Sequence, residues 1–227
     1  MQKNTISIII PALNEAANIA KTVSLAQKGS NVEIIIVDGG SQDETMAIAK
    51  SLNVKVLSAS PGRAIQMNTG AAIATGDILL FLHADTMLPP NFDQMVTKIL
   101  AESAIVAAAF ELKIDAKIGG IRLLEKMINW RSHFFSLPYG DQAISVKADQ
   151  FHKIGGFPEL PIMEDFVFIR NLKKLGKIAI IPVPVITSGR RWQKLGVFRT
   201  TAINQMMIIG YYLGISPEKL AQFYRRN

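Results

Sequence analysis

The 227-residue chain contains no cysteine and only three histidines. The absence of cysteine excludes a disulfide framework and thiolate chemistry, so a bound metal ion is expected to have mainly oxygen ligands. No apolar run reaches the roughly 20 residues that span a bilayer. No signal segment precedes the first strand-like run, Ile6–Ile10. From these absences we expect a cytoplasmic protein.

Two common nucleotide-binding loops are also missing. A dinucleotide fold carries G-x-G-x-x-G after its first strand, and a P-loop protein carries a Walker A sequence. The chain has Pro11-Ala-Leu-Asn-Glu15 after the first strand instead, and no Walker A sequence elsewhere. These absences argue against a nicotinamide-dependent dehydrogenase and against a P-loop nucleotidase.

Charge is distributed unevenly along the chain. The formal net charge is +7, and residues 190–227 hold seven basic residues and one acid, Glu218, which gives that segment +6. A nearly neutral body with a basic end indicates contact with an anionic partner, such as nucleic acid, a membrane surface or a phosphate-bearing substrate. A solvated basic helix face is the alternative interpretation.

Strand-like and helix-like segments alternate, which predicts an α/β fold with a mostly parallel central sheet flanked by helices. A capping-box pattern at Ser41 and Glu44 predicts a helix start there, and two prolines make the last strand an edge or irregular one. We expect one domain, with halves at about 1–104 and 105–195 and basic C-terminal helices at about 196–227. The predicted strands are 6–10, 32–37, 54–57, 78–82, 105–112, 142–146 and 178–185, and the predicted helices are 14–27, 42–52, 61–74, 91–103, 118–135, 165–175, 196–212 and 218–226.

Three acids, Glu15, Asp38 and Asp85, lie just past the ends of predicted strands. Ligands of open α/β sheets bind beyond the carboxyl ends of the strands. Asp38 precedes two glycines that allow close approach of a ligand, and it could accept hydrogen bonds from a base or a ribose. A single carboxylate such as Asp85, together with diphosphate oxygens and water, is a typical magnesium or manganese site.

Two further motifs lie in the second half. Glu164 and Asp165 begin a predicted helix, where they could simply complement the helix dipole or provide a general base. Arg190, Arg191 and Trp192 combine phosphate-binding guanidinium groups with a ring that could stack on a sugar or pack in the core.

Taken together, these segments resemble the family 2 glycosyltransferases, inverting enzymes with the GT-A fold. The matching segments cover about residues 5–195, and their order and spacing carry the resemblance: Ile8–Glu15, Ile35–Thr45, Gly62–Ala64, Asn68–Gly70, Gly76–Asp85, Gly155–Phe157, Glu164–Asp165 and Arg191–Trp192. The chain looks most like the small, stand-alone bacterial transferases, because it is short and has no membrane helices.

The resemblance implies the role of each candidate residue. Asp165 would be the catalytic base with Glu164 beside it, Arg191 would neutralise the leaving diphosphate, and Asp85 would bind Mn²⁺ or Mg²⁺. Acceptor or sugar contacts would come from Gly140, Asp141, Gln142 and Trp192. The donor, expected to be a UDP-sugar, would lie against Pro11, Ala12, Asn14, Glu15, Asp38, Gly39, Ser41, Arg63, Asn68, His83 and Ala84.

Some features depart from that pattern or leave alternatives open. Many family members have an aspartate where His83 stands, and often another at Thr86, so Asp85 would hold most of the metal. The expected partners are a nucleotide-sugar donor and a hydroxyl acceptor, lipid-linked or phosphorylated, with no nucleic acid. The apolar helix at 196–212 favours burial in the domain or a homodimer over peripheral contact with the inner face of the membrane. A sugar-phosphate nucleotidyltransferase and a non-catalytic adaptor for an anionic surface are the competing functions.

Overall fold

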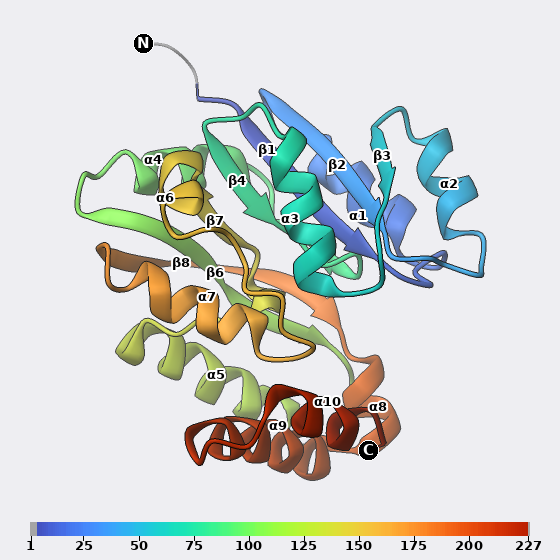
Figure 1. Ribbon diagram of the computed structural model, residues 1–227, viewed down its shortest axis with the longest axis vertical. Coiled ribbons are helices and arrows are strands. Elements are labelled where there is room, and N and C mark those ends of the chain that lie inside the picture. The colour runs from blue at the N-terminus through green and yellow to red at the C-terminus, as the bar shows by residue number, and fades with distance from the viewer. Residues whose placement is uncertain (1–3, 227) are drawn as a thin grey trace.

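The computed structural model describes residues 4–226, which form one mixed sheet with helices on both faces (Figure 1). The strands are β1 (Ile6–Ala12), β2 (Val32–Asp38), β3 (Lys55–Ser58), β4 (Ile78–Phe81), β5 (Thr86–Met87), β6 (Ile105–Asp115), β7 (Ile144–Lys147) and β8 (Lys177–Ser188). The helices are α1 (Ile19–Ala26), α2 (Thr45–Ser51), α3 (Arg63–Ile73), α4 (Phe92–Leu100), α5 (Ile121–Phe135), α6 (Ala148–Lys153), α7 (Glu164–Leu172), α8 (Arg190–Leu195), α9 (Val197–Tyr212) and α10 (Pro217–Arg226), with a 3-10 turn at Gly140–Gln142.

The first half of the sheet is parallel, as the alternating pattern predicts. The strand order is β3-β2-β1-β4-β7-β6-β8-β5, and β1 pairs in parallel with both β2 and β4. The register places Ala12 opposite Asp38, so the ends of β1 and β2 lie side by side. This pairing brings the segments that follow β1, β2 and β4 to one edge of the sheet.

The second half mixes both pairing directions. Strand β7 is antiparallel to β4 and to β6, whereas β6 and β8 are parallel. The predicted irregularity of the last strand is confirmed, because the register against β6 skips Pro182 and Val183. Strand β8 is not an edge strand, however, since the short β5 pairs along its other side.

Both faces of the sheet are covered, which explains the continuous apolar runs in the strands. Along β1, Ile8 and Ile10 face a core that α1, α4 and α5 complete, whereas Ile9 faces a second core formed with α3, α6 and α7. A third, smaller cluster joins the start of α7 to α9 and α10. The C-terminal helices therefore pack beside α7, at one end of the molecule (Figure 1).

Several predicted boundaries were wrong for local reasons. The helix after β1 begins only at Ile19, because Asn14 has a left-handed backbone with φ 54°. The predicted capping box does not form: α2 begins at Thr45 without a side-chain capping bond from Glu44. The Ser41 hydroxyl instead accepts a hydrogen bond from the Asn14 amide. The sequence patterns also missed β5, α6 and α8, which are all short.

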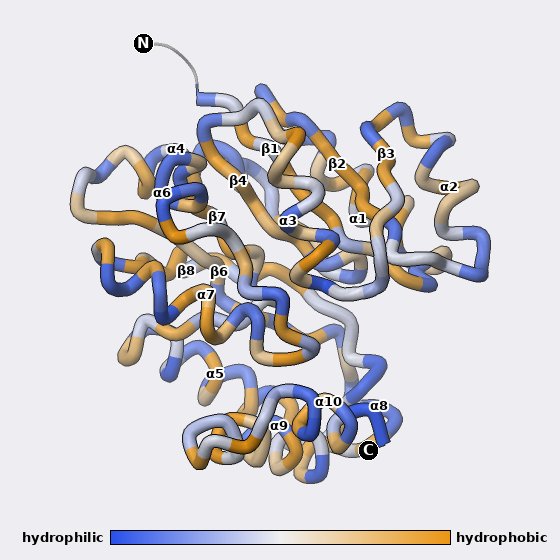
Figure 2. The backbone as a smooth tube through the Cα atoms, in the orientation of Figure 1, coloured by the Kyte–Doolittle hydropathy of each residue, from blue (hydrophilic) through white to orange (hydrophobic). Residues whose placement is uncertain are grey.

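Hydropathy along the chain follows this arrangement (Figure 2). The strands of the parallel half are mostly hydrophobic, and the loops beyond their ends are hydrophilic. No helix within the described residues is long and apolar enough to cross a membrane.

Close packing of α3 on the sheet predicts that even a small substitution at Gly70 lowers the stability of the protein. A methyl group there would lie 2.5 Å from Cγ2 of Ile9 and 3.1 Å from Cγ2 of Val37, both fully buried. We expect Gly70→Ala to lower the free energy of unfolding by about 1–3 kcal/mol, because overpacking outweighs the better helix propensity of alanine. Urea unfolding would measure it, with Gly119→Ala as the control because nothing lies within 4 Å of that position. Equal losses in the two variants would contradict this packing argument.

Candidate functional site

The loops after β1 and β2 are tied together by hydrogen bonds. The Asn14 amide donates to the Ser41 hydroxyl over 2.9 Å, and the Asn14 side-chain oxygen accepts from the amide of Gln42 over 2.8 Å. The Glu15 amide donates to the Thr45 hydroxyl over 2.7 Å. The predicted donor residues Asn14, Glu15 and Ser41 thus lie in one continuous rim at the edge of the sheet.

Asp38 closes this rim at the end of β2. Its side chain is nearly buried, with 4% of the residue exposed. One carboxylate oxygen accepts from the amides of Gly40 and Ser41 over 2.9 and 3.0 Å. The other oxygen is buried and has no partner among the described residues. Because an unpaired buried acceptor is costly, this oxygen is suited to accept a hydrogen bond from a ligand.

A residue that the sequence patterns missed, Gln66, supports the rim from below. Its side-chain amide donates to the carbonyl oxygens of Ala12 and Val37, both over 2.8 Å. A methyl group at Gly39 would lie 3.0 Å from the same amide, so Gly39 allows α3 to approach the loop. A buried glutamine on an otherwise apolar helix face is the one sequence signal that could have identified it.

Arg190, at the start of α8, links two of the predicted carboxylates. Its Nη2 atom lies 2.6 and 2.9 Å from the two carboxylate oxygens of Glu15 and 2.9 Å from an oxygen of Asp85. The Asp85 and Glu15 side chains are only about a fifth exposed, whereas that of Arg190 is half exposed. Two acids from separate strand ends therefore converge on a single cationic group.

A second group of charges lies around the start of α7. Arg63, at the start of α3, pairs with Glu164 over 3.1 Å. Burial raises the pKa of Glu164 even though Arg63 opposes the shift. The carboxylate of Asp165 accepts from the amide of Gly140 and from its own helix at Phe166, both over 2.7 Å. These two bonds fix Asp165 at the edge of the site.

Gly140 places His83 next to Asp165. A methyl group at Gly140 would lie 3.0 Å from Nε2 of His83 and 3.2 Å from Oδ2 of Asp165. The His83 Nε2 atom is buried, with no hydrogen-bond partner in the described part of the chain. Burial, together with the positive charge of Arg63, lowers the pKa of His83 to about 3. The imidazole is therefore neutral at pH 7.

The pKa of Asp141 is shifted in the opposite direction, upward. Burial raises the pKa of Asp141 to about 6, and the negative charges of Asp165 and Asp85 add to the shift while Arg131 opposes it. Its Oδ1 atom has no partner within residues 4–226. The predicted acceptor loop thus brings a weakly acidic carboxyl group next to Asp165.

The remaining predicted residues lie in or near the site, but their polar atoms are largely engaged elsewhere. Asn68 exchanges two hydrogen bonds with the backbone of Phe157, over 2.8 and 2.9 Å. Gln142 is fully buried and bonds to Ser132 and to the carbonyl of Phe110. These contacts give Asn68 and Gln142 positioning roles between distant segments.

Arg191 and Trp192 differ from Arg190 in their surroundings. The guanidinium of Arg191 lies 3.9 Å from the centre of the Tyr224 ring on α10, and Trp192 is half-buried against the main core. Of the backbone positions, Ala84 accepts a hydrogen bond from the Thr22 hydroxyl over 2.8 Å, and Pro11 lies within β1.

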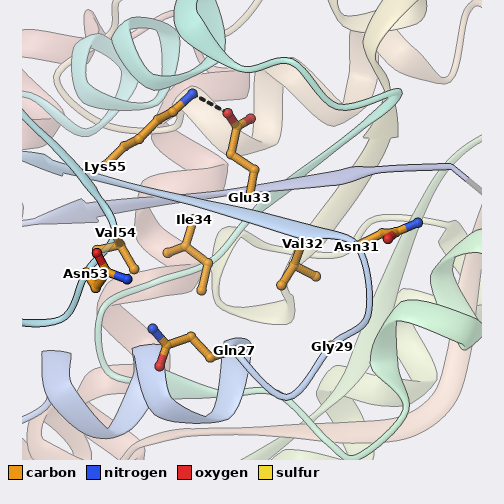
Figure 3. A pocket seen from close by; sticks show the side chains of 9 residues that line it. All are labelled: Gln27, Gly29, Asn31, Val32, Glu33, Ile34, Asn53, Val54 and Lys55. Atoms are coloured by element: carbon orange, nitrogen blue, oxygen red, sulfur yellow. Dashed lines mark hydrogen bonds and ion pairs between the residues drawn. The ribbon is translucent and has the colours of Figure 1, made fainter.

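One cavity lies away from these residues. It measures about 650 Å³ and lies at the opposite edge of the sheet, around the beginnings of β2 and β3 (Figure 3). Its charged pair, Lys55 and Glu33, is already bonded. Although burial opposes the shift, hydrogen bonds from Lys55 and Ser7 lower the pKa of Glu33 to about 2. The charges of this pair therefore satisfy each other.

The neutral His83 predicts a specific acid sensitivity. Its pKa in the folded state, about 3, lies below the ordinary value of 6.5, so the unfolded chain binds more protons between these values. The contribution of the neutral His83 to the free energy of unfolding is fully present above about pH 6.5 and decreases as the pH falls toward 3. Urea unfolding across this range should show a shallower pH dependence for His83→Gln than for the wild type. His152→Gln, at an exposed position, is the control. A pH dependence of stability in His83→Gln equal to that of the wild type would contradict the lowered pKa of His83.

Comparison with known proteins gives consistent matches. An uncharacterized glycosyltransferase of Nostoc sp. is 31% identical over 118 residues, 48% of this chain and 37% of the relative. The 4,4'-diaponeurosporenoate glycosyltransferase of Staphylococcus haemolyticus is 36% identical over 93 residues, 37% of this chain and 25% of the relative. The matches thus span less than two fifths of these curated relatives.

Solved structures show the same fold at low identity. A mannosyltransferase of Pyrobaculum calidifontis in complex with GDP-Man and Mn²⁺ has a TM-score of 0.64 at 19% identity, over 82% of this chain and 57% of that one. The TarS 1–349 fragment of S. aureus with UDP has a TM-score of 0.67 at 17% identity, over 81% and 60%. The glucosyl-3-phosphoglycerate synthase of Mycobacterium tuberculosis, with Mn²⁺, UDP and glucosyl-3-phosphoglycerate, has a TM-score of 0.62 at 22% identity, over 89% and 79%.

The family model described as glycosyl transferase family 2 matches residues 7–157, from β1 to the segment before α7. That range includes the rim at Asp38, the Asp85 loop and Gly140. Because the match covers more than half of the sequence and the solved relatives share its fold, the chain belongs to glycosyl transferase family 2 and has the GT-A fold.

Proposed function

We propose that the chain transfers a sugar, with inversion, from a nucleoside-diphosphate sugar to an acceptor hydroxyl. The observation that carries this proposal is the convergence of Asp38, Asp85 and Asp165 at one edge of the sheet, with Arg63 and Arg190 among them. Two of the structural relatives were solved with UDP and one with GDP-Man. The family resemblance favours UDP for this chain.

Nucleoside recognition is assigned to the rim around Asp38. Its unpaired carboxylate oxygen would accept a hydrogen bond from the base or the ribose, and Gly39 and Gly40 leave space for that approach. The shape of the rim depends on Gln66 and Asn14. Arg63 and the neutral His83 would lie further along the donor, toward the catalytic carboxylates.

The carboxylates at Arg190 fit a divalent cation supported by substrate oxygens. Across residues 4–226, no three histidine, aspartate or glutamate side chains converge to hold a metal alone. Asp85 and Glu15 nevertheless contact the same guanidinium nitrogen, so their carboxylates lie close enough to share one positive charge. Asp85, with Glu15 beside it, would hold Mn²⁺ or Mg²⁺ together with diphosphate oxygens and water. The ion would stabilise negative charge on the leaving diphosphate.

Asp165 is assigned as the general base. The acceptor oxygen attacks the anomeric carbon as the bond from that carbon to the diphosphate breaks, and Asp165 takes the hydroxyl proton. The bonds from the Gly140 and Phe166 amides hold its carboxylate in place. Glu164 would position Arg63 through their ion pair, and Asp141 would contact the sugar or the acceptor.

Arg190 and Arg191 would neutralise the leaving group. Guanidinium groups suit diphosphate because they offer paired donors. Arg191 was the residue predicted for this role, but Arg190 is the one that contacts Asp85. We therefore infer that Arg190 moves from the two carboxylates to the diphosphate when the donor and its metal bind.

The acceptor is proposed to be a hydroxyl on a lipid-linked or phosphorylated molecule. Among relatives, one enzyme is named for a diaponeurosporenoate and another for 3-phosphoglycerate. The alternative of sugar-phosphate nucleotidyl transfer is not favoured, because Pro11–Glu15 is not a glycine- and lysine-bearing loop.

Nucleotide titration tests the donor site. We expect UDP to bind in the presence of Mn²⁺, and Asp85→Asn or Asp38→Ala to weaken this binding by roughly tenfold or more, since each removes a charged contact. Isothermal titration with UDP and GDP, with and without Mn²⁺, would measure it. Asp77→Asn is the matched control, since that carboxylate lies at the start of β4 and bonds to the Thr5 amide. Full affinity in both site variants would reject the proposal.

Asp165→Asn separates catalysis from binding. Loss of a general base typically costs about 10²–10⁴-fold in turnover, so we expect slower release of UDP from the donor with an unchanged affinity for UDP. Donor hydrolysis by water provides the assay before an acceptor is identified, and the exposed Asp149→Asn is the control. Wild-type turnover in Asp165→Asn would show that another group is the base.

Arg190→Gln tests the shared carboxylate pair. Without the guanidinium, Glu15 and Asp85 lose their competing cation, so we expect tighter binding of Mn²⁺ alone and weaker binding of UDP with Mn²⁺. Electron paramagnetic resonance of free Mn²⁺ would report the first effect and calorimetry the second. Lys194→Gln, on the same helix, is the charge-matched control. Unchanged Mn²⁺ binding in Arg190→Gln would contradict the proposed exchange.

A further inference from the structure

Helix α5 carries an apolar stripe on the side that faces away from the core. Leu123, Met127, Trp130 and Phe134 are 65%, 57%, 61% and 70% exposed. Their spacing of four, three and four residues places them on one side of the helix. The rings of Trp130 and Phe134 stack with centres 5.2 Å apart. Single exposed apolar residues are normal, but a continuous stripe of this kind marks an interaction surface.

Helix α9 also exposes apolar side chains on its outer side, at its beginning and at its end. Phe198 is 93% exposed, Ile209 is 56% exposed, and Leu213, just after the helix, is 75% exposed. The opposite side of α9 is buried through Ile203 and Met207. The helix is thus apolar on both its inner and its outer side, so burial in the domain accounts for only half of its apolar character.

Both helices lie at the same end of the molecule (Figure 1), where Figure 2 shows hydrophobic segments along α9 and hydrophilic ones at α8 and the end of α10. Their inner sides pack beside the catalytic elements. Arg131 of α5 lies 3.5 Å from the centre of the Tyr139 ring, next to Gly140. Met207 of α9 packs with Met163 and Phe166. These two residues flank Glu164 and Asp165 in the sequence. Only the thickness of the helix itself therefore separates each exposed outer side from the acceptor side of the site.

The charge at this end determines which partner fits. Of the seven basic residues in 190–227, Arg190 and Arg191 belong to the candidate site. The other five are exposed and, with the acid Glu218, give this end a charge of +4, to which the exposed Lys126 of α5 adds. Two copies of the chain joined through this end would bring two such segments together, and their like charges would repel. An anionic bilayer surface attracts them instead, and it accepts aromatic side chains at the level of its headgroups.

We propose that the outer faces of α5 and α9, with the basic C-terminal residues, form a docking surface for an anionic lipid bilayer. The aromatic and aliphatic side chains insert at the headgroup boundary, and lysine and arginine side chains contact the anionic headgroups. The docking itself does not depend on the proposed transfer reaction. Only its consequence, delivery of a lipid-borne hydroxyl to Asp165, rests on the proposed function.

Vesicle flotation with the full chain tests this surface. We expect binding to vesicles of phosphatidylcholine with phosphatidylglycerol and much weaker binding to phosphatidylcholine alone. The double variants Trp130→Ser/Phe134→Ser and Phe198→Ser/Ile209→Ser should each bind the anionic vesicles about tenfold more weakly, because buried apolar groups are lost. Arg225→Gln/Arg226→Gln should also bind about tenfold more weakly. Ile73→Ser, an exposed apolar residue of α3, is the control and should bind like the wild type.

Other outcomes overturn the proposal in distinct ways. Absence of flotation, or flotation that the double variants leave unchanged, would show that these faces do not dock on lipid. A dimer that the same variants dissociate in analytical ultracentrifugation, without flotation, would assign the surface to a second copy. Titration of UDP with Mn²⁺ in each variant keeps the two proposals apart. Unchanged nucleotide binding shows an intact fold, and flotation without any nucleotide binding would retain the surface and reject the transfer reaction.

Discussion

The register of β1 against its two parallel neighbours determines where the donor-side groups lie. Because Ala12 pairs with Asp38 and Ile9 pairs with Phe81, the chain leaves β1, β2 and β4 at one edge of the sheet. A one-residue slip would turn every side chain of a strand to the other face. Burial of both faces prevents it, since Ile8, Ile9 and Ile10 are all fully buried. The apolar core thus fixes the positions of polar residues that it does not contact.

Electrostatic pairing then connects the two halves. Arg63 links α3 to Glu164, and Arg190 links the start of α8 to Glu15 and Asp85. Each bond joins residues more than 100 positions apart in the chain, so the site exists only in the folded protein. The neutral His83 lies near Arg63 and the weakly acidic Asp141 lies near Asp165 and Asp85, and burial disfavours charge on both groups.

Sequence patterns predicted those parts of the fold that depend on residues close together in the chain. Runs such as Ile34–Val37 and the acids after them identified the parallel half and the Asp38 and Asp85 loops. They did not show which of two adjacent arginines contacts Asp85, because that depends on how α8 turns after β8. They also could not show that the amide of Gln66 supports the rim, or that Asn68 pairs with Phe157, since both contacts join distant segments. The periodicity of α5 predicted a helix, but only the structure shows that its aromatic side faces outward.

A crystal structure of the protein with UDP and Mn²⁺ tests the central claim most directly, namely that the strand-end carboxylates form a donor site held by Arg190 until the donor binds. The account predicts the uridine against Asp38, the ion between Asp85 and the diphosphate, and the Arg190 guanidinium moved from Glu15 and Asp85 to the diphosphate. A nucleotide bound elsewhere, for example in the cavity beside Glu33 and Lys55, with Arg190 still bonded to both carboxylates, would contradict it.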